Sequence, residues 1–225
     1  MATFVFIHGA GGRASYWELV GAAVRAAGHD TLAVDLPCDD DAAGWSEYAD
    51  AVVEAIGDRR GDLVLVAQSL GGFTAPLVAD RVPVELIVLV TAMVPKPGET
   101  GGEWWGNTGL ADARAAQGLP EDAELFVQDV PPDVLAAAGP PRDQSGTPMD
   151  QPFALDRWPD VPTRFLLCMD DLFFPPDWMR EVVRDRLGIE PVEVPGGHCA
   201  FLSQPRPLAA ALVRAWEERT SLGAG

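Results

Sequence analysis

Short apolar runs alternate with segments of helical periodicity along most of the chain. Runs such as TFVFI (3–7) and DLVLVA (62–67) have the length and composition of buried strands. Between such runs, apolar residues recur every three or four positions, which is the spacing of an amphipathic helix. The predicted strands span 3–7, 31–34, 62–67, 84–90, 163–169 and 191–194, and the predicted helices span 13–27, 45–57, 70–81, 177–187 and 207–219.

A strand followed by a helix, repeated in this way, predicts a parallel, doubly wound sheet. The run 62–67 supports this prediction, because a continuously apolar strand is typical of a sheet that is covered on both faces. The chain has 225 residues, enough for one sizeable core and short for two independent domains. We therefore expect an α/β fold with a mostly parallel, doubly wound sheet of about six strands.

Residues 95–160 break this alternation. They are rich in Pro and Gly and carry only weak helical patterns, at 110–117 and 132–138. A segment of this length inside a compact domain is either a lid or a disordered insertion. Aromatic residues favour the lid, because a solvated linker rarely carries them; they are Trp104, Trp105, Phe126 and Phe153. The predicted organisation is a core formed by 1–94 and 161–225, with a small cap, 95–160, inserted after the fourth strand.

The charge balance is strongly acidic, with 16 Lys and Arg against 34 Asp and Glu and a formal net charge of −18. Such a surface repels phosphate backbones, which argues against nucleic acid as a partner. Cys38, Cys168 and Cys199 are odd in number and widely spaced, which disfavours a disulfide framework and a zinc site. The chain enters a strand at once, without a signal-like segment, and no apolar stretch reaches membrane-spanning length. We expect a cytoplasmic protein with reduced thiols, no membrane association, no metal and no organic cofactor. Its expected partner is a small-molecule substrate, and the oligomeric state, a homodimer included, is left open.

The stretch AQSLGG (67–72) places Ser69 where a buried strand turns into a helix. A sharp turn of this kind holds its central residue in a strained backbone geometry and presents the hydroxyl above the edge of the sheet. Strand and helix pass closely there, so the residues two before and two after must be small, and here they are Ala67 and Gly71. Ser69 is therefore a candidate nucleophile. The alternative is a serine that merely caps the following helix.

Such a serine needs a base, and the chain contains three histidines. His8 follows the first strand, and His29 lies in a polar turn between a helix and a strand. His198 follows the last strand, so it leaves the same carboxyl edge of a parallel sheet as Ser69. His198 is therefore the candidate base.

The base needs a carboxylate to orient it, and the fifth strand ends in CMDDLFFPP, with Asp170 and Asp171. Adjacent residues in an extended segment point in opposite directions, so one of the two serves. The chain order Ser69, Asp171, His198 fits a Ser-Asp-His triad in this architecture. Asp35, at the end of the second strand, is a weaker rival, and the acidic pair could instead cap the helix near 177.

The glycine-rich loop HGAGG (8–12) follows the first strand. Backbone N–H groups from this loop and from the residue after the serine can converge on one point, where they would stabilise a negatively charged carbonyl oxygen. We assign this oxyanion hole to Ala10 and Leu70. A tight strand-to-helix turn without a binding role is the alternative for the loop.

Together, HGAGG, AQSLGG, CMDDLFFPP and GGHCAFLSQP resemble the α/β-hydrolase superfamily, and the likeness covers nearly the whole chain. They look like the branch that contains plant methyl esterases, hydroxynitrile lyases and many bacterial hydrolases. The resemblance implies an α/β-hydrolase fold with the cap between the strands at 84–90 and 163–169. In that branch the acid stands four residues before a proline, which favours Asp171, four before Pro175, over Asp170.

The chain also departs from that pattern. Gln68 stands before the serine, where the branch often has histidine, and Cys199 and Gly9 stand where its lyases carry a lysine and a threonine. Without that lysine, lyase activity is disfavoured. Related dehalogenases and epoxide hydrolases carry aspartate at the position of Ser69, which argues against both activities.

The expected function is a serine hydrolase that cleaves a small carboxylic ester, lactone or thioester through a Ser-His-Asp triad and an acyl-enzyme. Two alternatives stay open: a C–C bond hydrolase or biosynthetic enzyme that uses the same triad, and a ligand-binding protein that does not catalyse. Residues in or near the cap are expected to line an apolar substrate pocket, with core packing as the alternative for each. They are Met93, Trp104, Trp105, Phe173 and Trp178.

Overall fold

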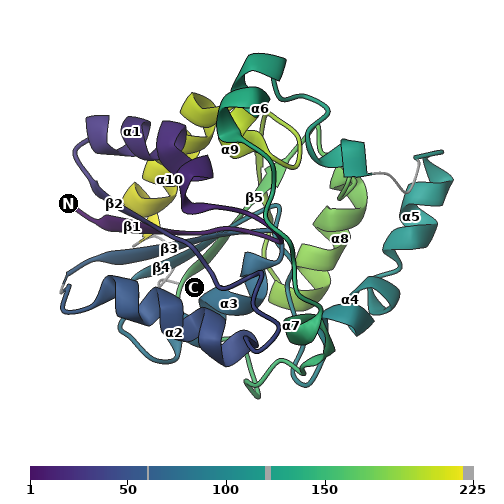
Figure 1. Ribbon diagram of the computed structural model, residues 1–225, viewed down its shortest axis with the longest axis horizontal. Coiled ribbons are helices and arrows are strands. Elements are labelled where there is room, and N and C mark those ends of the chain that lie inside the picture. Colours follow the sequence, from purple (N-terminus) through teal and green to yellow (C-terminus); the bar gives the residue numbers. More distant parts are fainter. Residues whose placement is uncertain (60, 120–122, 220–225) are drawn as a thin grey trace.

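In the described part of the chain, six parallel strands form one sheet in the order β2-β1-β3-β4-β5-β6. Figure 1 shows this sheet between two layers of helices. The computed structural model describes residues 1–59, 61–119 and 123–219. The strands are β1 (Thr3–Ile7), β2 (Asp30–Val34), β3 (Leu63–Gln68), β4 (Leu86–Val90), β5 (Thr163–Cys168) and β6 (Val192–Val194). The expected α/β fold with a six-stranded doubly wound parallel sheet is therefore confirmed.

Helices cover both faces of the sheet, and the strands alternate their side chains between two buried clusters. In β1, Val5 and Ile7 pack toward one face, and Phe4 and Phe6 pack toward the other. The first face is covered by α2 (Trp45–Ile56), α3 (Gly71–Ala79) and α8 (Pro176–Leu187). The second face is covered by η1 (Ala14–Trp17), α1 (Glu18–Ala26), α9 (Ala200–Ser203) and α10 (Pro205–Glu217). Within the described ranges, no helix is both long and apolar enough to cross a membrane.

Two predicted helices differ locally from those in the structure. The helix expected at 13–27 is divided into η1 and α1, and the carboxylate of Asp35 accepts the Ala14 N–H at 2.7 Å where η1 begins. The last helix is preceded by the short α9, because Pro205 removes a backbone donor and starts a new helix at its N1 position.

The strand order places the ends of particular strands side by side. The order reverses between β1 and β3, because β2 lies outside β1 and all later strands follow on the other side. A crevice at such a reversal, at the carboxyl ends of the strands, is where α/β sheets bind ligands. The loop at 8–12 and the turn at Ser69 leave these two neighbouring strands.

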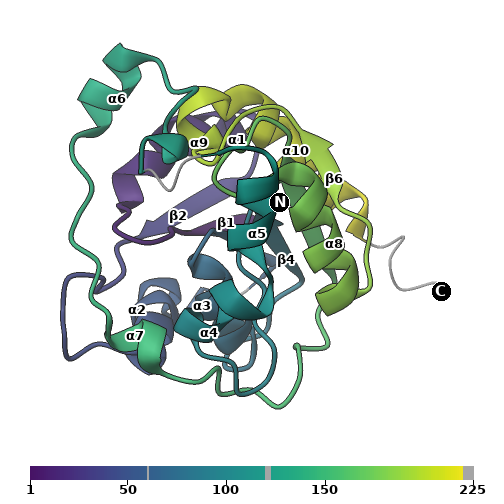
Figure 2. The ribbon, with the colours of Figure 1, turned by 90° about the vertical axis from the view of Figure 1, so that its right-hand side faces the viewer.

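The segment between β4 and β5 contains several short helices, and Figure 2 looks onto them from the side of the carboxyl ends of the strands. Residues 120–122 of the expected cap and 60 and 220–225 of the expected core lie outside the described residues. The weak helical patterns at 110–117 and 132–138 correspond to two of these helices, α5 (Leu110–Ala116) and α6 (Pro132–Ala138). The helices are α4 (Gly101–Asn107), α5 (Leu110–Ala116), η2 (Ala123–Phe126), α6 (Pro132–Ala138) and α7 (Thr147–Asp150).

Helix α4 begins at a capping signal that is present in the sequence. The hydroxyl of Thr100 accepts the Glu103 N–H at 3.0 Å, and the Glu103 carboxylate accepts the Thr100 N–H at 3.0 Å. This reciprocal pair is a capping box, which a Thr followed three residues later by Glu predicts. Helix propensity alone does not predict α4, because its first two residues, Gly101 and Gly102, are poor helix formers.

A buried ion pair joins this segment to α8. Arg186 binds Glu99 at 2.5 and 2.9 Å, and their side chains are only 3% and 4% exposed. Burial by itself would raise the pKa of Glu99. Hydrogen bonds from Arg186, Asn107 and the Lys96 N–H outweigh burial, so the pKa of Glu99 lies below its ordinary value.

We expect Glu99→Ala to lower the free energy of unfolding by about 3–5 kcal/mol, because it leaves the Arg186 guanidinium buried without a counter-charge. Since folding lowers the pKa of Glu99 from its ordinary 4.5, its contribution is complete above that value and disappears as the pH falls through the folded pKa. Urea unfolding of parent and variant at several pH values measures this: the difference should be constant at neutral pH and shrink in acid.

The matched control is Glu181→Ala, which removes the carboxylate of an exposed pair with Arg184 on α8. Such a pair contributes less than about 1 kcal/mol. Equal destabilisation by the two variants would contradict a special role for the buried pair.

Candidate active site

Ser69 occupies a left-handed backbone conformation, with φ at 51°, between β3 and α3. Residues other than glycine rarely adopt this conformation. The close approach of strand and helix explains the small neighbours. A Cβ on Gly71 would lie 2.9 Å from the carbonyl oxygens of Ile7 and His8, and one on Gly72 would lie 1.9 Å from that of Met93. The sequence AQSLGG therefore folds into a turn that only small residues allow.

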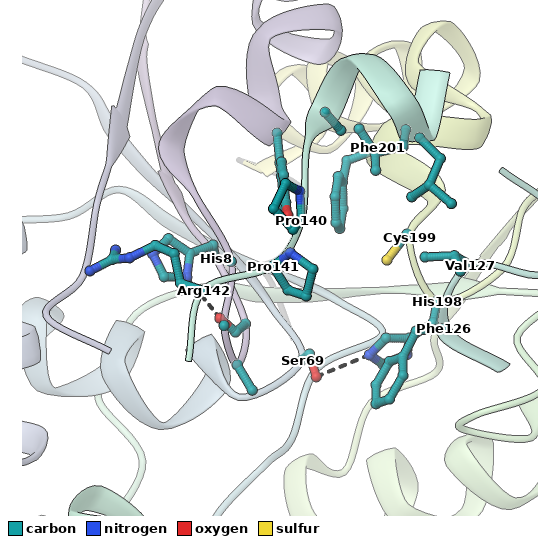
Figure 3. Close-up of a pocket in the computed structure, with 18 of the residues that line it drawn as sticks. His8, Ser69, Phe126, Val127, Pro140, Pro141, Arg142, His198, Cys199 and Phe201 are labelled. Carbon is teal, nitrogen blue, oxygen red and sulfur yellow. Dashed lines mark hydrogen bonds between the residues drawn. The ribbon is translucent and has the colours of Figure 1, made fainter. Parts of the chain in front are cut away.

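Two hydrogen bonds join Ser69, His198 and Asp171. Figure 3 shows the one between Ser69 and His198. The Ser69 hydroxyl lies 3.0 Å from His198 Nε2, and His198 Nδ1 lies 2.9 Å from Asp171 Oδ2. All three side chains are buried, with Asp171 fully inaccessible. This arrangement can move a proton from the hydroxyl to the imidazole, while the carboxylate orients the ring and balances its charge.

The two adjacent aspartates have different partners, although they lie in a turn after β5 and not in the extended segment that the sequence suggested. Asp171 Oδ1 accepts the N–H groups of Phe173 and Phe174 at 2.9 and 2.8 Å, so the carboxylate is held from both sides. Asp170 turns away and accepts the Gly196 N–H at 2.9 Å. Asp35, the rival carboxylate, instead accepts the Ala14 N–H where η1 begins.

The loop that carries His198 is held by groups that sequence reasoning missed. Gln68 Nε2 donates to the His198 carbonyl at 3.1 Å, and Asp129 Oδ2 accepts the Gly197 N–H at 2.7 Å. The ring of Phe126 lies 5.1 Å from the imidazole. No local sequence signal points to Asp129, because its partner is 68 residues away.

The loop at 8–12 lies against the Ser69 turn. A Cβ on Gly9 would lie 2.7 Å from Ser69 Cβ, so only glycine fits there. Within the described ranges, neither the Ala10 N–H nor the Leu70 N–H has a hydrogen-bond acceptor in the protein, so both can serve a ligand. His8 is not available as a base, because its Nε2 accepts the Leu36 N–H at 3.0 Å and burial lowers its pKa.

The segment after α6 supports the same loop from outside. The Arg142 N–H donates to the Gly11 carbonyl at 2.8 Å, and the Gly11 N–H donates to Gln144 Oε1 at 3.2 Å. Gly11 has a φ of 61°, and a Cβ there would lie 2.6 Å from the Arg142 carbonyl oxygen. The glycine is therefore required by both backbone conformation and space.

A cavity of about 870 Å³ opens beside Ser69. In Figure 3, Pro140 and Pro141 border it on one side, and Val127, Cys199 and Phe201 border it on the other. Most of its walls are apolar. Helix α6 contributes Pro132, Leu135, Ala136 and Ala138.

None of the five residues expected to contact substrate is among those that line this cavity. Trp104 is fully buried and its ring packs against Trp105, Phe174 and Trp178. Its Nε1 donates to the Val94 carbonyl at 3.1 Å, while Trp178 Nε1 donates to the Thr108 carbonyl at 2.7 Å. Met93 is buried behind the Ser69 turn, and Phe173 lies 5.0 Å from the His198 ring. Mutual packing of these large rings explains why they lie outside the lining.

Cys199 follows the histidine and lines the cavity. Burial raises the pKa of its thiol to about 12, and the nearby Asp171 and Asp129 add to that rise. Such a thiol is a poor nucleophile, because the thiolate is the reactive form. Within the part of the chain that the structure describes, no group of His, Cys, Asp and Glu is placed to hold a metal ion.

Comparisons with known proteins agree with this architecture. Residues 4–211 match the alpha/beta hydrolase family, and the chain therefore belongs to that family. The probable esterase PIR7A of rice, Oryza sativa, is 29% identical over 94% of this chain and 95% of that protein. Methylesterase 7 of Arabidopsis thaliana is 27% identical over 93% of this chain and 94% of its own length. The protein is thus an esterase-like α/β hydrolase of the branch that includes the plant methyl esterases.

Solved structures share the fold over nearly the full length. A pyrethroid hydrolase from Sphingobium faniae JZ-2 has a TM-score of 0.78 at 20% identity and covers 98% of this chain and 100% of its own. Polyneuridine aldehyde esterase has a TM-score of 0.78 at 19% identity, covering 96% of this chain and 99% of its own. At such identities the likeness establishes the fold.

We expect the Cys199 thiol in the folded protein to react with iodoacetamide at pH 8 about three orders of magnitude more slowly than a free cysteine, because so little thiolate is present. Mass spectrometry of peptides after timed alkylation measures this. Protein unfolded in urea is the control, in which the thiol should react at the ordinary rate. Equal rates in the folded and unfolded states would contradict the raised pKa.

Proposed function

We propose that this protein is a serine hydrolase that cleaves an uncharged, largely apolar carboxylic ester, lactone or thioester through an acyl-enzyme. One observation carries the proposal: the chain of hydrogen bonds from Ser69 through His198 to Asp171 lies beside an apolar cavity. The esterase names of the rice and Arabidopsis relatives support the same reaction class.

In the first half of the reaction, Ser69 Oγ attacks the carbonyl carbon while His198 Nε2 takes its proton. Asp171 holds Nδ1–H and balances the positive charge that forms on the ring. The carbonyl oxygen becomes negative and is stabilised by the N–H groups of Ala10 and Leu70. In comparable sites, loss of one such donor costs about 3–4 kcal/mol of transition-state stabilisation.

The first half ends when the bond from the acyl carbon to the leaving oxygen or sulfur breaks and His198 gives its proton to that atom, so that the acyl group remains on Ser69. Water then attacks the acyl carbon while His198 removes one of its protons. The bond between that carbon and Ser69 Oγ breaks, the serine oxygen takes the proton back from His198, and the carboxylic acid leaves. Protons and electron pairs balance between these side chains and water, so the proposal includes no cofactor.

The cavity supports an apolar substrate. Its charged border residue, Arg142, donates to both oxygens of Asp39 and to the Leu36 carbonyl, so its charge is already compensated. A charged group on a substrate bound beside Ser69 would contact the Pro, Ala, Leu, Val and Phe residues that line the cavity. Burying a charge against such walls is costly.

Ser69→Ala is expected to reduce kcat for p-nitrophenyl butyrate by at least about a thousandfold, because no other group beside the imidazole can form the acyl-enzyme. A fluorophosphonate probe should label the parent protein stoichiometrically at Ser69 and leave the variant unlabelled. Steady-state kinetics and intact mass measure the two effects.

The matched control is Ser203→Ala on α9, which removes a buried hydroxyl that has no hydrogen-bond partner within the described part of the chain. It should keep the parent's activity. Folded parent protein that is not labelled would contradict catalysis by Ser69 and favour the ligand-binding alternative.

Leu135→Asp is expected to raise the KM for p-nitrophenyl octanoate about tenfold or more, because it puts a charge on the α6 wall of the cavity. The KM for p-nitrophenyl acetate should change less, since its acyl group is much smaller and buries less apolar surface against the wall. Measuring both esters with the parent and the variant separates a pocket effect from a general one.

Leu19→Asp is the matched control, because Leu19 is also exposed and helical but lies on α1 outside the cavity lining. Trp105→Ala tests the sequence-based pocket in the same assay. A raised KM with Trp105→Ala but not with Leu135→Asp would place the acyl chain against the tryptophan cluster instead.

A further inference from the structure

Thr91 follows β4 and has an unusual backbone conformation. Its φ is 39°, and Ser69 and Thr91 are the two residues other than glycine with positive φ in the described part of the chain. This conformation is especially unfavourable for a β-branched residue. Such strain persists only where the surroundings enforce it, and it concentrates at functional sites.

The backbone around Thr91 is bonded to the Ser69 turn. The Ser69 N–H donates to the Val90 carbonyl at 3.4 Å, and the Met93 N–H donates to the Ser69 carbonyl at 2.9 Å. The Thr91 N–H itself donates to the Leu166 carbonyl of β5 at 2.9 Å. Thr91 is therefore held between the strand that carries the serine and the strand that carries the aspartate.

The Thr91 hydroxyl joins the proposed triad. It is fully buried and donates to Asp171 Oδ2 at 2.5 Å, the same oxygen that accepts His198 Nδ1–H at 2.9 Å. One carboxylate oxygen thus serves two donors. The hydroxyl restrains the position of that oxygen. It also stabilises the negative charge of the carboxylate, which weakens the attraction between that charge and the imidazole.

We propose that Thr91 is a positioning residue that acts on His198 through Asp171. This inference rests on the proposed function, because it concerns the base of the same reaction. The hydroxyl has two consequences: it keeps Oδ2 in line with Nδ1–H, and it limits how strongly the carboxylate stabilises the protonated imidazole. Removing it should therefore lower the rate and make His198 more basic.

Other titratable and charged groups lie near Asp171 and His198 on the elements around them. They are Cys168 of β5, Asp170 beside it, Cys199 before α9, Asp129 of the insertion and Arg114 of α5, which lies over the Phe173 ring. Burial raises the pKa of both thiols, so they stay neutral between pH 5 and pH 9. A substitution at Thr91 leaves all of these groups in place.

The test is Thr91→Val, which keeps the β-branched shape and its backbone cost but removes the hydroxyl. We expect kcat for p-nitrophenyl butyrate to fall roughly tenfold with KM unchanged. The midpoint of the acid limb of kcat/KM should rise by about half a pH unit or more. Thr91→Ser, which restores the hydroxyl, should return both values close to those of the parent.

Thr74→Val is the matched control. Thr74 is fully buried in α3, and its hydroxyl has no hydrogen-bond partner among the described residues. It should leave both the rate and the pH midpoint unchanged. If Thr91→Val does not fold, the pair Thr91→Ala and Thr91→Ser isolates the hydroxyl in the same way.

The rate of fluorophosphonate labelling at each pH distinguishes a failure of the proposed function from a failure of the role of Thr91. If the parent protein is not labelled, the proposed function fails and this inference fails with it. If the parent is labelled but the variants without the hydroxyl keep its rate and its pH midpoint, only the role of Thr91 is overturned. A loss of stability without a shift of the midpoint would show a purely structural threonine and would also overturn it.

Discussion

The left-handed turn at Ser69 is the constraint on which the rest of the site depends. It costs on the order of 1–3 kcal/mol of backbone strain, and the surrounding structure holds it in place. Hydrogen bonds to Val90 and Met93 fix the turn on one side, and the close contact with Gly9 fixes it on the other. Because of this, the hydroxyl stands at the edge of the sheet with its orientation already set.

The parallel sheet places the other residues of the site next to Ser69, because each of them follows the end of a neighbouring strand. The neighbouring strands β3, β4, β5 and β6 end at one edge. Ser69, Thr91, Asp171 and His198 follow these ends in the same order. The hydrogen bonds among them run across the sheet edge, in apolar surroundings formed by Phe126, Phe173 and Phe174. A low-polarity environment strengthens such charge-assisted bonds, so the acidic surface of the protein matters little there.

The insertion between β4 and β5 contributes residues to the site. It contributes Phe126 beside the imidazole, Asp129 on the Gly197 N–H, and Arg142 on the Gly11 carbonyl. Helix α6 and the segment that follows it also form part of the cavity wall. The other end of the insertion is joined to α8 by the buried Glu99–Arg186 pair. The insertion therefore contacts both the loop at 8–12 and the loop that carries His198.

The sequence by itself determined the six strands, their parallel arrangement and the family, because periodicity and short motifs are local signals. It also placed Ser69, Asp171 and His198 at the ends of strands, since strand ends follow from the pattern. The tertiary structure decided the remaining features. It directed Asp170 to Gly196, packed Trp104 and Trp178 into a cluster instead of the cavity wall, and joined Thr91 to Asp171 across 80 residues. The physical reason is that a hydrogen bond or a cavity wall depends on distances between elements, and those distances exist only after the helices and strands have packed together.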